Sequence, residues 1–181
     1  MADRPAQPVH PSAPPQAGGT AGGTSPRPRT LDALFAAQAA RTPLAPAVTD
    51  GRRSWTYRDL AERVERLARD LRRRGAGPER TVALVLPRSM ELVAAELAVV
   101  RAGAAFLPVD PGYPAERRAL MLADAAPAIV LDDPADVSRV LETALPAGPD
   151  VPGAADGTGG PAPAGTDHPA YVIYTSGSTG T

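Results

Sequence analysis

Four short segments of this 181-residue chain are almost continuously apolar, and helical patterns separate the first three of them. They cover residues 81–86, 105–109, 128–131 and 170–174. Parallel strands covered by helices on both faces have this character, because neither side of the strand meets water. The sequence therefore predicts an α/β fold with a mostly parallel sheet, built from βαβαβ units.

Helical periodicity fills the remaining parts of the predicted domain. Thr30, Thr56 and Ser89 each precede a helical pattern and are suited to cap it, and Thr56 with Asp59 has the spacing of a capping box. Gly75 is suited to end the second helix. The predicted helices cover residues 31–41, 57–74, 90–100 and 115–124, and a short hairpin around 50–51 lies before the second.

Two stretches lack the apolar residues that a packed core requires. Residues 1–29 hold only Met1 and Val9 as large apolar side chains, and residues 146–169 hold only Val151. Both are rich in glycine and proline, so neither can offset the entropy lost when a backbone is ordered. We predict a disordered tail over 1–29, a domain over 30–181, and a flexible loop over 146–169 within that domain.

Composition excludes several functional classes. The chain has no cysteine, so disulfide scaffolds, thiolate zinc sites and cysteine nucleophiles are excluded. The two histidines, His10 and His168, lie too far apart to suggest a metal site or a catalytic triad. The 19 basic residues, all arginine, are balanced by 20 acidic residues, which argues against nucleic-acid binding. The three arginines 72–74 are interpreted as the cationic end of a solvated helix, where Glu62 pairs with Arg66 and Glu65 with Arg69.

No stretch is long and apolar enough for a signal peptide or a membrane span, and we expect a cytoplasmic protein without a membrane partner.

The segment after the last apolar stretch carries the clearest chemical signal. It is rich in hydroxyl groups and glycines, which can form a concavity of N–H and O–H donors around a phosphate. A flexible linker has a similar composition, so the residues alone leave both interpretations open. The lysine of a P-loop does not follow Gly180, and no G-x-G-x-x-G fingerprint occurs. The residues concerned are Thr175, Ser176, Gly177, Ser178, Thr179, Gly180 and Thr181.

Three blocks, in this order, resemble the adenylation domains of nonribosomal peptide synthetases, which belong to the adenylate-forming superfamily. Residues 55–60 read WTYRDL, similar to (S/T)Y-x-(E/D)-L in that family. Residues 101–114 read RAGAAFLPVDPGYP, similar to (K/R)AG-x-A(Y/F)-x-P-(I/V/L)DP-x-YP. Residues 170–180 read AYVIYTSGSTG, similar to the phosphate loop AY-x-I-YTSG(S/T)TG. The first two blocks also have purely structural explanations, as a helix cap and as a helix end followed by a strand.

The resemblance implies an ATP-dependent ligase. An amino acid carboxylate would attack the α-phosphorus of ATP, with Mg²⁺ on the phosphates, and the aminoacyl group would pass to the phosphopantetheine thiol of a peptidyl carrier protein. Residues 175–180 would cradle the β- and γ-phosphates, and Thr181 begins the part of the loop that continues as Pro-Lys-Gly in the family. No residue of this chain is predicted to be a catalytic group or a metal ligand.

The family's nucleoside contacts, amino-acid pocket and late catalytic lysine have no counterpart in these 181 residues. We therefore expect an N-terminal fragment that is inactive alone, from a stand-alone enzyme or the loading end of a synthetase. Two alternatives stay open: a fragment of an acyl- or aryl-CoA ligase, and a non-enzymatic truncated interaction module or pseudogene product. In each case an uncovered sheet edge and apolar face should make the chain aggregate.

Overall fold

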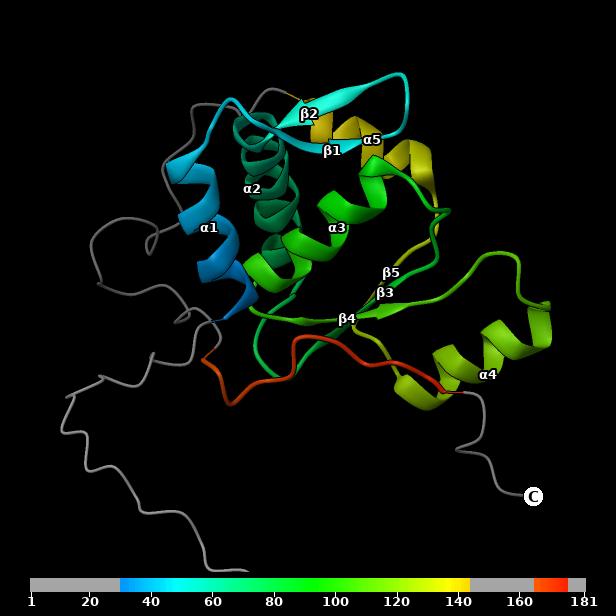
Figure 1. The fold of residues 1–181 in the computed structure, drawn as a ribbon. Coiled ribbons are helices and arrows are strands. Elements are labelled where there is room, and N and C mark those ends of the chain that lie inside the picture. Colours follow the sequence, from blue (N-terminus) through cyan, green and yellow to red (C-terminus); the bar gives the residue numbers. More distant parts are fainter. Residues whose placement is uncertain (1–29, 144–164, 176–181) are drawn as a thin grey trace, which may run out of the picture.

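The computed structural model describes residues 30–143 and 165–175, and these form an α/β unit with helices on both sides of a parallel sheet (Figure 1). The elements, in chain order, are α1 (Leu31–Arg41), β1 (Pro46–Thr49), β2 (Ser54–Thr56), α2 (Tyr57–Arg73), β3 (Thr81–Leu84), α3 (Met90–Arg101), β4 (Ala105–Pro108), α4 (Ala115–Ala125), β5 (Ile129–Leu131) and α5 (Pro134–Glu142).

The sheet confirms the predicted α/β class. Strands β3, β4 and β5 are parallel and lie in the order β4-β3-β5, so β3 is central. Strands β1 and β2 form a separate antiparallel hairpin, as expected from the turn at Asp50 and Gly51. The first three predicted strands of the parallel sheet, 81–86, 105–109 and 128–131, begin and end within two residues of β3, β4 and β5.

Alternate residues of β3 face two different apolar layers, which explains why this strand is apolar throughout. Val82 and Leu84 face the larger core, formed with α2, α3 and α5, and Ala83 faces a smaller cluster with Leu107 and Met121. Figure 1 shows α1, α2, α3 and α5 on one side of the sheet and α4 on the other. Among the described helices, only α4 lies on the face against which Val172 and Tyr174 of the third sequence block pack.

Helix ends follow the predicted signals. Thr30 and Ser89 cap α1 and α3, because their hydroxyl oxygens accept hydrogen bonds from the first turn. Gly75 ends α2 with a φ of +95°, a conformation that costs a residue with a Cβ atom free energy. The predicted pairs Glu62–Arg66 and Glu65–Arg69 are both present, at 3.4 and 3.1 Å.

Two features differ from the sequence-based prediction. Helix α5 was not predicted, although Asp133 caps it, Pro134 occupies its first turn, and Val137 and Leu141 are buried four residues apart. Residues 170–174, predicted as a strand, pair with β4 only through a single parallel bridge between Phe106 and Tyr171. The predicted tail (1–29) and most of the predicted loop (146–164) lie outside the described residues.

Candidate functional site

The first sequence block, residues 55–60, serves as the start of α2. The Asp59 carboxylate accepts hydrogen bonds from the Thr56 hydroxyl at 2.7 Å and the Thr56 N–H at 2.9 Å, and these bonds hold the pKa of Asp59 below its usual value. The Asp59 N–H donates in return to the Thr56 hydroxyl at 3.2 Å. The predicted capping box is therefore confirmed, and this block stabilises the start of α2.

The second block, residues 101–114, forms the path from α3 through β4 to the carboxyl edge of the sheet. Gly103 turns the chain out of α3 with a φ of +85°. After β4, the Asp110 carboxylate accepts a hydrogen bond from the Gly112 N–H at 2.8 Å, and the Asp110 carbonyl accepts one from the Tyr113 N–H at 3.0 Å. The side chain of Asp110 therefore shapes the turn that leads into α4.

Two arginines of the first turns of α4 hold this turn in place. The Arg118 guanidinium donates to the Pro111 carbonyl at 3.0 Å. The guanidinium carbon of Arg117 lies 4.4 Å from the centre of the Tyr113 ring, a cation–π contact. Positive charge therefore stands at the edge of the sheet where β4 ends.

The third block approaches that same edge along β4. Phe106 donates through its N–H to the Ala170 carbonyl at 3.1 Å and accepts from the Val172 N–H at 2.9 Å. Because the bridge is parallel, residues 173–175 leave the sheet at its carboxyl end, beside the end of β4. In open α/β folds, ligands bind outside the carboxyl ends of the strands.

Of the seven predicted phosphate-binding residues, the structure describes only Thr175, which is exposed at this edge. The other six, Ser176, Gly177, Ser178, Thr179, Gly180 and Thr181, lie outside the described residues. The fold thus brings the start of the predicted loop to the expected edge.

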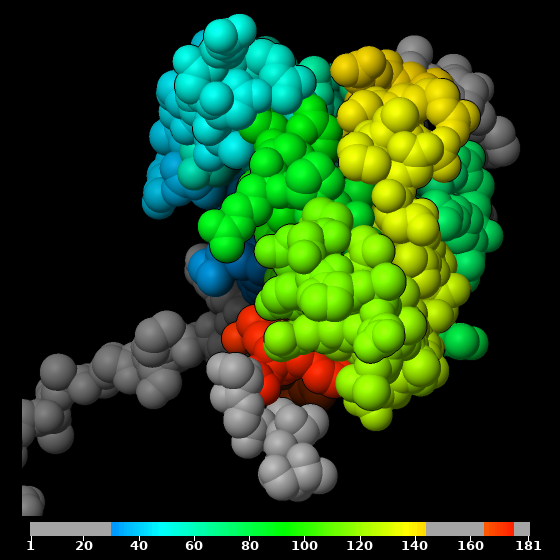
Figure 2. Space-filling model, turned by 90° about the vertical axis from the view of Figure 1, so that its right-hand side faces the viewer, coloured from blue at the N-terminus to red at the C-terminus, as the bar shows by residue number. Residues whose placement is uncertain are grey.

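Helix α4 connects the second and third blocks. Val172 and Tyr174 pack against the cluster that contains Met121 of α4, and the Tyr174 hydroxyl lies 2.5 Å from an oxygen of the Asp124 carboxylate. That hydrogen bond is the main cause of a raised pKa for Tyr174. Figure 2 shows α4 directly against the segment 165–175 on one face of the molecule. The Tyr174–Asp124 contact was not predicted, because no local pattern links residues fifty positions apart.

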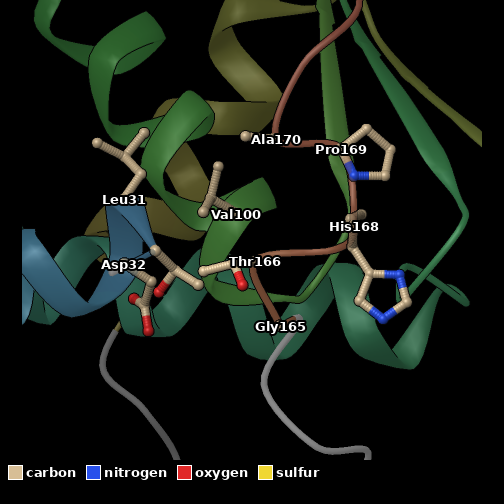
Figure 3. A pocket seen from close by; sticks show the side chains of 10 residues that line it. Leu31, Asp32, Val100, Gly165, Thr166, His168, Pro169 and Ala170 are labelled. Carbon is tan, nitrogen blue, oxygen red and sulfur yellow. The ribbon is translucent and has the colours of Figure 1, made fainter. Parts of the chain in front are cut away.

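A cavity of about 280 Å³ lies at the opposite edge of the sheet (Figure 3). Its lining includes Leu31, Val100, Ala104, Thr166 and Ala170. Ala104 precedes β4 and Ala170 precedes the bridge, so the cavity is at the amino ends of the strands. It is therefore separate from the edge where Thr175 lies.

Residues 30–143 and 165–175 contain no group of three histidine, aspartate or glutamate side chains that could hold a metal ion. Within the same ranges, no helix combines the length and apolar character needed to cross a membrane.

The known proteins similar to this chain include synthetases and synthases of two bacteria. A family model described as "AMP-binding enzyme" matches residues 35–181. CymA of Salinispora arenicola, named as a probable nonribosomal peptide synthetase, is 48% identical over 170 residues, which cover 86% of this chain and 2% of that protein. Enterobactin synthase component F of Escherichia coli K12 is 44% identical over 161 residues, covering 83% of this chain and 12% of the relative.

Solved structures give the same result. The nonribosomal peptide synthetase FmoA3 matches with a TM-score of 0.61 and 37% identity, over 80% of this chain and 16% of that one. A form of FmoA3 with bound α-methyl-L-serine-AMP matches with a TM-score of 0.62 and 33% identity, over 80% and 17%. The resemblance to nonribosomal peptide synthetase adenylation domains is thereby confirmed, and the chain spans only a small part of the length of these relatives.

Proposed function

This chain belongs to the AMP-binding enzyme family, and we propose that it forms the first part of an amino-acid-activating domain in nonribosomal peptide synthesis. The domain would join ATP and an amino acid into aminoacyl-AMP and pyrophosphate. It would then transfer the aminoacyl group to the phosphopantetheine thiol of a carrier protein. The proposed part of the domain extends from residue 30 to residue 181, and residues 1–29 would form a tail before it.

One observation carries the proposal: Thr175 leaves the sheet at the carboxyl end of the strands, at the start of a hydroxyl- and glycine-rich segment. Backbone N–H groups and hydroxyls of residues 175–180 would bind the β- and γ-phosphates of ATP there. The relatives named as nonribosomal peptide synthetases and the aminoacyl-AMP bound to FmoA3 support an amino acid as the second substrate.

In the first step, a carboxylate oxygen of the amino acid bonds to the α-phosphorus and the bond from that phosphorus to the bridging oxygen breaks. Pyrophosphate then leaves with the negative charge, and donors held around it stabilise that charge as it develops. In the second step, a thiolate attacks the acyl carbon and AMP leaves.

A Mg²⁺ ion would bind to the phosphates of ATP. When bound, it would neutralise phosphate charge. The residues of this chain would contribute hydrogen-bond donors and a fixed loop direction.

The test uses the complete protein encoded by the reading frame that contains this sequence. Amino-acid-dependent exchange of labelled pyrophosphate into ATP is expected. We expect Thr179→Ala to lower kcat/KM for ATP at least tenfold, because a hydrogen-bond donor to the phosphates is lost. Thr49→Ala is the matched control, since Thr49 is exposed on the distant hairpin and should leave the exchange unchanged.

Two results would contradict the proposal. Formation of acyl- or aryl-CoA without amino-acid-dependent exchange would identify a CoA ligase. The absence of exchange with every class of acid tested would favour a non-enzymatic interaction module.

A further inference from the structure

The attachment of the third block to the sheet is narrow. Two main-chain hydrogen bonds join it to Phe106 of β4, one at Ala170 and one at Val172. On the face away from α4, Tyr171 is 56% exposed and Ile173 is 58% exposed, so these side chains hold the segment weakly. A side-chain anchor at the residue before Thr175 would add to this attachment.

The Tyr174 side chain provides that anchor. Its hydroxyl lies 2.5 Å from Asp124 Oδ2 and 3.4 Å from the Met121 carbonyl oxygen. A hydroxyl has one hydrogen to donate, so the nearer and charged carboxylate receives it. A tyrosine hydroxyl is protonated at neutral pH, and the hydrogen bond to Asp124 raises the pKa of Tyr174 further, so the hydroxyl is a donor there.

The partner side of this contact is itself fixed. Met121 is buried in the smaller core cluster, and the ring of Tyr174 packs on that cluster. Helix α4 ends one turn later, where Ala126 adopts a φ of +41° and donates to the Leu122 carbonyl at 3.0 Å. Asp124 thus stands on a helix held at its start by the Asp110 turn and at its end by the entry to β5.

We propose that Tyr174 is a positioning residue: its hydrogen bond to Asp124 ties the start of the phosphate-binding loop to α4 and sets the direction in which Thr175 leaves the sheet. The inference rests on the proposed function. It also makes a specific prediction: loss of this hydrogen bond should weaken ATP binding and leave amino-acid binding unchanged.

The test compares variants of the complete protein by pyrophosphate exchange. Tyr174→Phe removes only the hydroxyl, and we expect KM for ATP to rise roughly tenfold with KM for the amino acid unchanged. Asp124→Ala should have the same effect, and the double variant should lose little more, because both remove one bond. Asp124→Asn keeps an oxygen acceptor, so this variant should retain most of the wild-type affinity for ATP that Asp124→Ala loses.

Tyr171→Phe is the matched control. Tyr171 lies three residues earlier, stacks on Phe106 with ring centres 5.7 Å apart, and faces away from α4, so its variant should match the wild type. A merely structural effect of Tyr174→Phe would lower kcat for both substrates and leave KM for ATP unchanged.

The outcomes separate the two proposals. An active wild type whose KM for ATP is unaffected by Tyr174→Phe overturns the positioning role and leaves the proposed function standing. A wild type without exchange activity overturns the proposed function and this inference with it. A selective rise in KM for ATP in Tyr174→Phe and Asp124→Ala, with a KM for ATP near the wild-type value in Asp124→Asn, supports both proposals.

Discussion

At the scale of single residues, Glu65 of α2 contacts three arginines, and one of them, Arg101, belongs to α3. Its carboxylate lies 3.1 Å from Arg69, 3.7 Å from Arg72 and 3.0 Å from Arg101, and Arg101 also pairs with Asp32 at 3.1 Å. Burial raises the pKa of Glu65, but the hydrogen bond and charge of Arg101 and the nearby Arg72 and Arg69 outweigh it and hold the pKa below its usual value. The predicted salt-bridged face of α2 therefore also fastens α3.

Glu65→Gln should lower the free energy of unfolding by about 1–2 kcal/mol, because three cations lose their shared anion. Urea denaturation at pH 7 measures the change. The matched control is Glu62→Gln, which removes one exposed pair and should cost less than about 0.5 kcal/mol. Equal effects of the two variants would contradict this role of Glu65.

The same residue predicts a dependence on pH. Because the folded-state pKa of Glu65 is lowered, its contribution is fully present above the ordinary value of 4.5 and is lost as the pH falls through the folded-state pKa. The difference in unfolding free energy between the wild type and Glu65→Gln should be constant from pH 5 to 7 and shrink below about pH 4.5. A difference that grows on acidification would refute the assignment.

At the scale of elements, the junction between α3 and β4 depends on one backbone conformation. Gly103 has a φ of +85°, and the next residue, Ala104, is buried and donates to the Val99 carbonyl at 3.1 Å. The chain therefore reverses from helix to strand within three residues. This explains the glycine of the Arg-Ala-Gly sequence in the second block in purely structural terms.

Gly103→Ala should destabilise the chain by roughly 1–2 kcal/mol, because a Cβ atom disfavours the left-handed region. Thermal unfolding followed by circular dichroism checks this. Gly77→Ala is the control: Gly77 has an ordinary φ and open space around its Cα atom, so little change is expected. If both variants melted at the wild-type temperature, Gly103 would not be required for this turn.

Element prediction succeeded where the signal is local and failed where it is not. The capping box of Thr56 and Asp59 appears in four consecutive residues, and the structure confirms it. Helix α5 also carries local signals, in Asp133, Pro134 and the buried pair Val137 and Leu141, and could have been predicted. The weak pairing of residues 170–174 could not, because an apolar run does not show how much of it a neighbouring strand will bond.

At the scale of the whole molecule, the sheet has an exposed apolar region beside β4. Tyr171 and Ile173 are more than half exposed and lie on the outermost segment of the parallel sheet. Exposed apolar side chains on a sheet edge promote pairing between chains. The expected tendency to aggregate therefore has a defined location.

We expect the 181-residue chain, expressed alone, to associate as its concentration rises, as measured by sedimentation equilibrium. Ile173→Lys should reduce this association because it places a charge on the edge. Leu44→Lys should not, since Leu44 is 70% exposed in a turn far from that edge. A monomer of constant mass over the whole concentration range would contradict the prediction.

The sequence by itself determined the α/β class, the order of helices and strands as far as β5, and the family, because helix caps, periodicity and the three blocks are encoded in consecutive residues. It also predicted phosphate contacts for residues 175–181, which stay a prediction. Only the tertiary structure decided that β3 is central, that α4 lies on the face of the sheet opposite to the other described helices, and that Tyr174 bonds Asp124. Those features depend on packing between residues distant along the chain, and contacts of that kind leave no pattern in a local stretch of sequence.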